Sequence, residues 1–146
     1  MTNKTILLVE DNPDDVEMMH RALKLNNIYN EVIVVNNGAE ALDFFFGTGK
    51  YADRDLAVMP TVVILDLNLP KVNGLEVLRS IRANGLTKHL PVVILTSSRE
   101  EKDIISGYDL GVNRYVQKQV DFDQFAEAVS RIGLYWLLIN KVPPIK

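Results

Sequence analysis

The sequence predicts an α/β fold in which a parallel sheet carries helices on both faces. Five short apolar runs, most of them rich in Val and Ile, alternate strictly with amphipathic segments. Such runs are typical of strands buried on both faces, and strict alternation with helices is typical of a parallel sheet. The predicted strands are residues 5–10, 31–36, 61–66, 91–96 and the less apolar 112–118, which we expect at an edge of the sheet.

Each predicted helix begins at a residue that can cap its first turn. Asn12 precedes Pro13, which suits the first helical position, and the acidic residues Asp14 and Asp15 favour a helix N-terminus. The later starts pair a cap with an acidic or amide residue three positions on. These pairs are Asn37 with Glu40, Asn73 with Glu76, Ser98 with Glu101, and Asp121 with Gln124.

Apolar residues at helical spacing predict the side of each helix that faces the core, rather than a cofactor site. They are Val16, Met19 and Leu23; Ala41, Leu42, Phe45 and Phe46; Leu75, Leu78 and Ile81; Ile104, Ile105 and Tyr108; and Phe122, Phe125, Ala126, Val129 and Gly133. Residues 47–60 are predicted to form a polar loop that is long for this class of fold.

The composition narrows the class of protein. A length of 146 residues suits one domain, predicted over 1–146. The chain has no cysteine, which excludes disulfides and thiolate metal sites, and a net charge of −3 without a basic block argues against nucleic acid as a partner. The start lacks a signal peptide pattern, and the longest uncharged apolar run, residues 132–139, is too short to span a bilayer. We therefore expect a cytoplasmic protein without a membrane partner.

Polar side chains stand where the predicted strands end. Glu10 and Asp11 follow the first strand, Asp66 ends the third, Thr96 ends the fourth and Lys118 ends the fifth. The carboxyl ends of parallel strands share one edge, where ligands bind in open α/β sheets. Taken singly, these residues could be helix-capping acids, a strand-end hydroxyl and a simple salt bridge. Together they predict a site.

The chemistry of that site follows from its charges. Three carboxylates, Glu10, Asp11 and Asp66, would repel one another unless a hard cation such as Mg²⁺ lay among them. Lys118 and the Thr96 hydroxyl could contact phosphate oxygens. With the metal neutralising charge in an in-line transfer, Asp66 would act as the nucleophile and form an aspartyl phosphate.

With these residues in place, the sequence resembles the receiver domain of bacterial two-component response regulators, the CheY-like fold, over residues 4 to about 138. The resemblance is carried by dispersed motifs: Glu10-Asp11, the run from Asp66 to Pro70, Asn73-Gly74, Thr96, Tyr115 and Lys118. It implies a five-stranded parallel sheet of flavodoxin-like order 2-1-3-4-5, with five helices on its two faces.

The resemblance also implies roles for the site residues. Asp66 would accept a phosphoryl group from a sensor histidine kinase, in a phosphorelay in which the protein itself is not an enzyme. Mg²⁺ would be bound directly by Asp11, Asp66 and the backbone carbonyl of Asn68, and through water by Glu10.

Thr96 and Tyr115 would form the switch pair: Thr96 moves to the phosphoryl oxygen and Tyr115 turns inward behind it. The added charge would bias a two-state element. Packing of Tyr115 on an edge strand is the alternative interpretation of that residue.

One departure from the family pattern concerns the residue after Lys118. The family has a proline there, joined by a cis bond, whereas this chain has Gln119. A cis bond without proline costs roughly 3 kcal/mol relative to trans. Either the chain retains that strain or, as we expect, the bond is trans and the loop is placed differently.

The end of the sequence predicts a protein interface. Residues 132–139 are apolar on every side of the predicted helix, and one face of a helix is enough to pack on the sheet. A homodimer with C₂ symmetry would cover the remainder, whereas packing under the tail from Val142 to Pro144 is the alternative. The interface residues would be Leu134, Tyr135, Trp136 and Leu138.

No output domain is expected after this helix, so the signal should pass by contact with a downstream protein that the sequence does not identify. The long loop before the third strand, the missing proline after Lys118 and the run Tyr135-Trp136-Leu137 give a weaker resemblance to the regulators that serve bacterial phytochrome kinases. A phytochrome-type kinase is therefore the expected partner.

Three other functions fit the sequence less well. A Mg²⁺-dependent aspartyl-phosphate phosphatase of the haloacid dehalogenase kind needs an acid two residues after its nucleophile, where this chain has Asn68. A receiver-fold interaction module without phosphorylation usually lacks the acidic pair or the lysine, and both are present. Nucleotide binding would require a glycine-rich loop after the first strand, which is missing.

Overall fold

The structure, a computed structural model, describes residues 4–69, 72–96, 111–112, 114–118 and 121–131. The elements are β1 (Ile6–Val9), α1 (Pro13–Leu25), β2 (Val32–Val35), α2 (Gly38–Phe46), the 3₁₀ turn η1 (Gly49–Tyr51), β3 (Val62–Asp66), α3 (Gly74–Ala83), β4 (Val92–Thr96), β5 (Arg114–Gln117) and α5 (Phe122–Arg131). Strand and helix alternate as the sequence predicts from β1 to β4 and again from β5 to α5, while residues 97–110, between β4 and β5, lie outside the described part.

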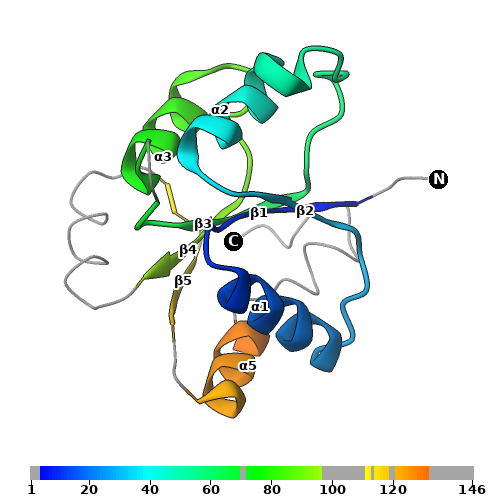
Figure 1. Ribbon diagram of the computed structural model, residues 1–146, viewed down its shortest axis with the longest axis vertical. Coiled ribbons are helices and arrows are strands. Elements are labelled where there is room, and N and C mark those ends of the chain that lie inside the picture. Colours follow the sequence, from blue (N-terminus) through cyan, green and yellow to red (C-terminus); the bar gives the residue numbers. More distant parts are fainter. Residues whose placement is uncertain (1–3, 70–71, 97–110, 113, 119–120, 132–146) are drawn as a thin grey trace.

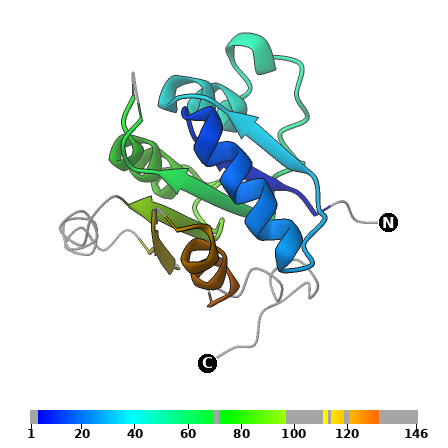
Figure 2. The same ribbon diagram turned by 60° about the horizontal axis from the view of Figure 1, so that its bottom comes forward.

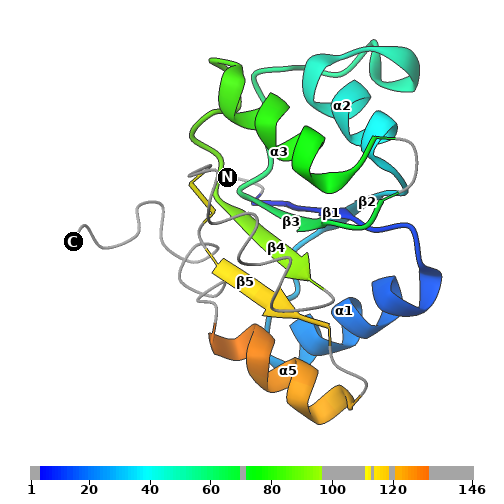
Figure 3. The same cartoon turned by 90° about the vertical axis from the view of Figure 1, so that its left-hand side faces the viewer.

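The strands form one parallel sheet in the order β2-β1-β3-β4-β5, so the predicted order is confirmed. β1 lies between β2 and β3, with Ile6 opposite Val32 on one side and Val62 on the other. β5 lies at the edge beside β4, as its weaker apolar pattern predicts. Because all pairings are parallel, the carboxyl ends of the strands share one edge; Figure 3 shows the β4 and β5 arrowheads pointing to the same side.

Helices cover both faces of the sheet. Figure 1 shows α2 and α3 on one side and α1 and α5 on the other, and Figure 2 brings α1 and α5 forward. β1 explains why both faces need cover, because all four of its residues are buried and they alternate between two apolar clusters. Ile6 and Leu8 belong to the cluster under α1 and α5, and Leu7 and Val9 to the cluster under α2 and α3.

The predicted helix faces are largely those that the structure buries. Met19 and Leu23 of α1 pack in one cluster with Phe125 and Val129 of α5. The side-chain amide of Asn26, at the end of α1, donates to the carbonyl of Ala126 in α5 at 3.3 Å. These contacts join two helices that are far apart in the sequence and hold the C-terminal end of α1 against α5.

α2 differs from the predicted stripe at three residues. Phe44 is buried, while Leu42 and Phe46 are only partly buried against the same cluster. The loop after α2 explains this, because the Arg54 guanidinium lies 4.1 Å from the Phe44 ring centre and its Nε donates to the Phe44 carbonyl at 2.7 Å. The loop therefore covers part of α2, and it contains the 3₁₀ turn η1.

The predicted caps of three helices are confirmed. The Asn12 side chain accepts hydrogen bonds from the backbone N–H groups of Asp14 and Asp15. The caps of α2 and α3 each accept from the backbone of the acidic residue three positions on, with Asn37 bonded to Glu40 and Asn73 to Glu76.

Several predictions concern residues outside the described part of the chain. These are the helix predicted from Ser98, the isomer of the bond to Gln119, and the interface residues Leu134, Tyr135, Trp136 and Leu138. Among the described residues, no helix is both long enough and apolar enough to cross a membrane.

Candidate functional site

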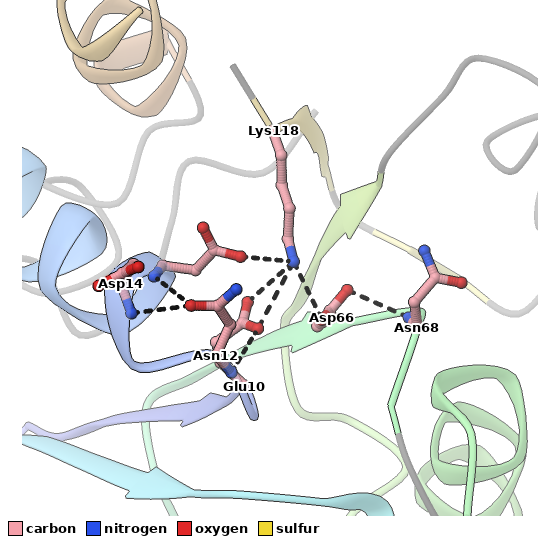
Figure 4. Close-up of polar contacts among 7 residues, drawn as sticks. Glu10, Asn12, Asp14, Asp66, Asn68 and Lys118 are labelled. Atoms are coloured by element: carbon pink, nitrogen blue, oxygen red, sulfur yellow. Dashed lines mark hydrogen bonds and ion pairs between the residues drawn. The ribbon is translucent and has the colours of Figure 1, made fainter. Parts of the chain in front are cut away.

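The acidic residues and the lysine predicted from the strand ends meet at one edge of the sheet. Glu10 directly follows β1, Asp66 is the last residue of β3, and Lys118 directly follows β5. Glu10 and Asp66 are each 1% exposed, whereas Asp11 is exposed. Figure 4 shows the Lys118 ammonium pointing toward the Glu10 and Asp66 carboxylates. The site thus has two buried carboxylates and a third that is exposed to solvent.

Asp66 is held at both of its carboxylate oxygens. Oδ1 accepts a hydrogen bond from the backbone N–H of Asn68 at 3.1 Å, and Oδ2 lies 3.1 Å from Nζ of Lys118. Behind it, the Gly74 N–H donates to the Leu67 carbonyl at 3.0 Å. A Cβ on Gly74 would lie 2.5 Å from the Asp66 carbonyl oxygen, so this close approach requires glycine.

Lys118 contacts three carboxylates. Its Nζ lies 3.0 Å from Asp15, 3.1 Å from Asp66 and 3.2 Å from Glu10. Burial by itself favours loss of the ammonium proton, but the negative charges of Asp66 and Glu10 outweigh it and raise the pKa of Lys118 above its ordinary value. The side chain therefore stays cationic and available to an anionic group.

The surroundings of Glu10 disfavour the ionised form of its side chain. Burial, and after it the charge of Asp66, raise the pKa of Glu10 from 4.5 to about 7, although Lys118 and the backbone N–H of Asn12 oppose the shift. Oε2 accepts from Asn12 N at 3.2 Å. Oε1 is buried and lies 3.2 Å from Lys118 Nζ, but within the described part of the chain no hydrogen bond reaches it.

The carboxylates fit a divalent cation. Glu10, Asp11 and Asp66 each offer an oxygen within 4.8 Å of the others. The buried Oε1 of Glu10 has an unused acceptor capacity, and the exposed Asp11 lies on the side open to water. A hard cation takes oxygen ligands together with water, as this half-open group allows.

The remaining predicted residues lie near the same edge. Thr96 is the last residue of β4 and pairs with Gln117 of β5, while the placement of its side chain lies outside the described part. Tyr115 stands opposite Ile94 and is partly buried against the cluster under α2 and α3. Asn68 is exposed, two residues after Asp66.

The contact that Asp15 makes with Lys118 was not predicted. The predicted place of Asp15 in the first turn of α1 is confirmed. The ion pair at 3.0 Å joins residues 103 positions apart. The sequence does contain one signal for this contact. The first turn of α1 begins just after the end of β1, where Glu10 lies, so its side chains lie near the same edge of the sheet.

Comparison with known proteins identifies the family. The sequence model of the family described as response regulator receiver domain matches residues 6–130 of this chain. Response regulator Rcp1 of Synechocystis sp. (strain ATCC 27184 / PCC 6803 / Kazusa) is 39% identical over 140 residues, covering 96% of this chain and 93% of that protein.

Solved structures agree. The bacteriophytochrome response regulator RtBRR is 48% identical with a TM-score of 0.82, covering 98% of this chain and 85% of that one. The phosphorylated cyanobacterial phytochrome response regulator RcpA is 39% identical with a TM-score of 0.79, covering 93% and 95%. The Mn²⁺-bound form of response regulator Rcp1 is 37% identical with a TM-score of 0.80, covering 97% and 99%. The chain therefore belongs to the response regulator receiver domain family of two-component signalling.

Proposed function

We propose that this chain is the phosphoacceptor of a two-component phosphorelay, taking a phosphoryl group from a sensor histidine kinase on Asp66 in a Mg²⁺-dependent reaction. The observation that carries the proposal is the position of the Asp66 carboxylate. It is buried at the end of β3, 3.1 Å from the Lys118 ammonium and within reach of the Glu10 and Asp11 carboxylates.

The transfer would be an in-line displacement. An Asp66 oxygen forms a bond to phosphorus while the bond between phosphorus and the kinase histidine nitrogen breaks, and its electron pair returns to the imidazole. Lys118 faces the developing negative charge, and its raised pKa keeps it protonated. The backbone N–H of Asn68 holds the other Asp66 oxygen. Mg²⁺, when bound, supplies charge neutralisation at the phosphoryl oxygens.

The metal would be held directly by Asp11, Asp66 and the Asn68 backbone carbonyl, and through water by Glu10. The Mn²⁺-bound form of the relative Rcp1 supports a divalent cation in this family, and the three-carboxylate group supports it in this chain. Mg²⁺ suits the site because it keeps several waters and needs only one or two protein carboxylates.

Signal output would pass through protein contacts of a single receiver domain spanning 1–146. Thr96 and Tyr115 would act as the switch pair, with Thr96 contacting the phosphoryl oxygen. A homodimer would form through the last helix, using Leu134, Tyr135, Trp136 and Leu138. The expected kinase is of the phytochrome type, since the similar structures include RtBRR and RcpA, both described as regulators of phytochromes.

The test uses a small phosphodonor and intact mass. Purified protein with Mg²⁺ and acetyl phosphate should gain one phosphoryl group, and the gain should disappear in Asp66→Asn and with a chelator. Asp14→Asn is the matched control, because it removes one exposed carboxylate from the same edge without contacting Lys118. No gain in the wild-type chain under any divalent metal would refute the phosphoacceptor role and favour an interaction module.

A second measurement addresses the partner. A phytochrome-type kinase labelled on its histidine should transfer the label to the wild-type chain faster than to an unrelated receiver domain. Equal rates would contradict the phytochrome assignment and leave the acceptor role intact. Gel filtration of both phosphorylation states would report the dimer and whether it depends on phosphate.

A further inference from the structure

Asp15 contacts Lys118 but does not belong to the set of three carboxylates that could hold a metal ion. It lies in the first turn of α1, and its Oδ2 is 3.0 Å from Lys118 Nζ. Its side chain is 30% exposed, against 1% and 2% for Glu10 and Asp66. Among the described residues it is not a member of the group formed by Glu10, Asp11 and Asp66.

The contacts of Lys118 show what Asp15 does to its charge. An ammonium has three N–H donors. Here they face three carboxylates, and Asp15 is one of them. Glu10 and Asp66 are buried and would retain the ammonium in its place without Asp15. The negative charge of Asp15 therefore partly offsets the positive potential that Lys118 produces at Asp66. It has less effect on the position of Lys118.

We propose that Asp15 acts through Lys118: by accepting one hydrogen bond of the ammonium on the α1 side, it favours binding of a cation at the site and disfavours the phosphoryl dianion on Asp66. This inference rests on the proposed phosphoacceptor function. It assigns to a residue of α1 the control of how readily Asp66 gains a phosphoryl group and how long it keeps it.

The charges make the two effects opposite in sign. Removal of the Asp15 charge makes the potential at the site more positive. A divalent cation then binds more weakly, whereas a dianion on Asp66 finds Lys118 with fewer competitors. A loss of structure would instead weaken both functions, so the opposite signs separate an electrostatic role from a merely structural one.

The test compares Asp15→Asn with Asp14→Asn. Both changes remove one carboxylate from the first turn of α1, and only Asp15 contacts Lys118. Mg²⁺ affinity is measured by calorimetry without phosphodonor. The rate of phosphorylation by acetyl phosphate and the half-life of the product are measured with the metal saturating for each variant.

In Asp15→Asn we expect the Mg²⁺ dissociation constant to rise roughly two- to fivefold and the phosphorylation rate, the half-life or both to rise by a similar factor, the size expected for a partly exposed ion pair. Asp15→Glu should restore both toward wild type. Asp14→Asn should change each by less than the Asp15 variant does.

Two results would overturn the inference: both properties falling together in Asp15→Asn, or equal effects of the Asp15 and Asp14 changes. A wild-type chain that takes up no phosphoryl group refutes the proposed function instead. The Asp15 inference is then decided by Mg²⁺ affinity alone, which must fall in Asp15→Asn and be retained in Asp14→Asn.

Discussion

Glu10 should make the stability of the metal-free protein depend on pH. Burial and the Asp66 charge raise the pKa of Glu10 from 4.5 to about 7, so the folded state holds this proton more tightly than the unfolded state does. The free energy of unfolding is therefore highest, as far as Glu10 is concerned, below pH 4.5. This free energy falls as the pH rises from 4.5 to about 7, and it becomes level above about pH 7.

The size of the effect follows from the pKa difference. Each tenfold difference in proton affinity between two states corresponds to about 1.4 kcal/mol. The change from 4.5 to about 7 thus corresponds to a loss of roughly 3 kcal/mol when Glu10 ionises in the folded protein. That loss is a sizeable share of the roughly 5–15 kcal/mol by which domains of this kind are stable.

Urea unfolding followed by circular dichroism, with a chelator present, measures this dependence between about pH 5 and pH 8. Glu10→Gln is the control variant, because it keeps the shape of the side chain and removes its titration. Taking the difference between wild type and variant at each pH cancels the titration of other groups. The wild type should lose roughly 2–3 kcal/mol relative to the variant across the range.

Parallel pH profiles for wild type and Glu10→Gln would refute this reasoning. They would mean that Glu10 ionises in the folded protein as easily as in the unfolded chain. A wild type that gains stability relative to the variant as the pH rises would reverse the sign, and would show that Lys118 outweighs burial and Asp66 at this carboxyl group.

Two further predictions concern packing at and behind the site. Gly74→Ala should destabilise the fold by about 1–3 kcal/mol and slow phosphorylation, because the new Cβ would meet the Asp66 carbonyl at 2.5 Å; Gly85→Ala, where nothing lies within 4 Å, is the control, and equal urea midpoints would contradict the reasoning. Thr87→Val should cost about 1–3 kcal/mol in urea unfolding, because the buried Thr87 hydroxyl donates to the Ile81 carbonyl at 2.7 Å. Thr87→Ser keeps the hydroxyl and should lose less; a smaller loss in the valine variant would argue against the hydrogen bond.

Much of the fold follows from local patterns in the chain. Apolar β-branched runs set the strands, and Asn12, Asn37 and Asn73 cap the helices that the sequence predicts, because these preferences act within a few residues. The burial of Phe44 was not predicted. It depends on Arg54, ten residues further on, which covers the ring and uses its carbonyl, and helical spacing alone does not report on such a loop.

The apolar runs along the chain are enough to identify the residues at the strand ends, since Glu10, Asp66 and Lys118 each adjoin one of them. The differences in burial and ion pairing among the residues of the site arise from the packing of the elements. This packing buries Glu10 and exposes its neighbour Asp11, and it brings Asp15 within 3.0 Å of Lys118. Burial and ion pairing depend on which elements pack side by side, and the spacing of residues along one element does not contain that information.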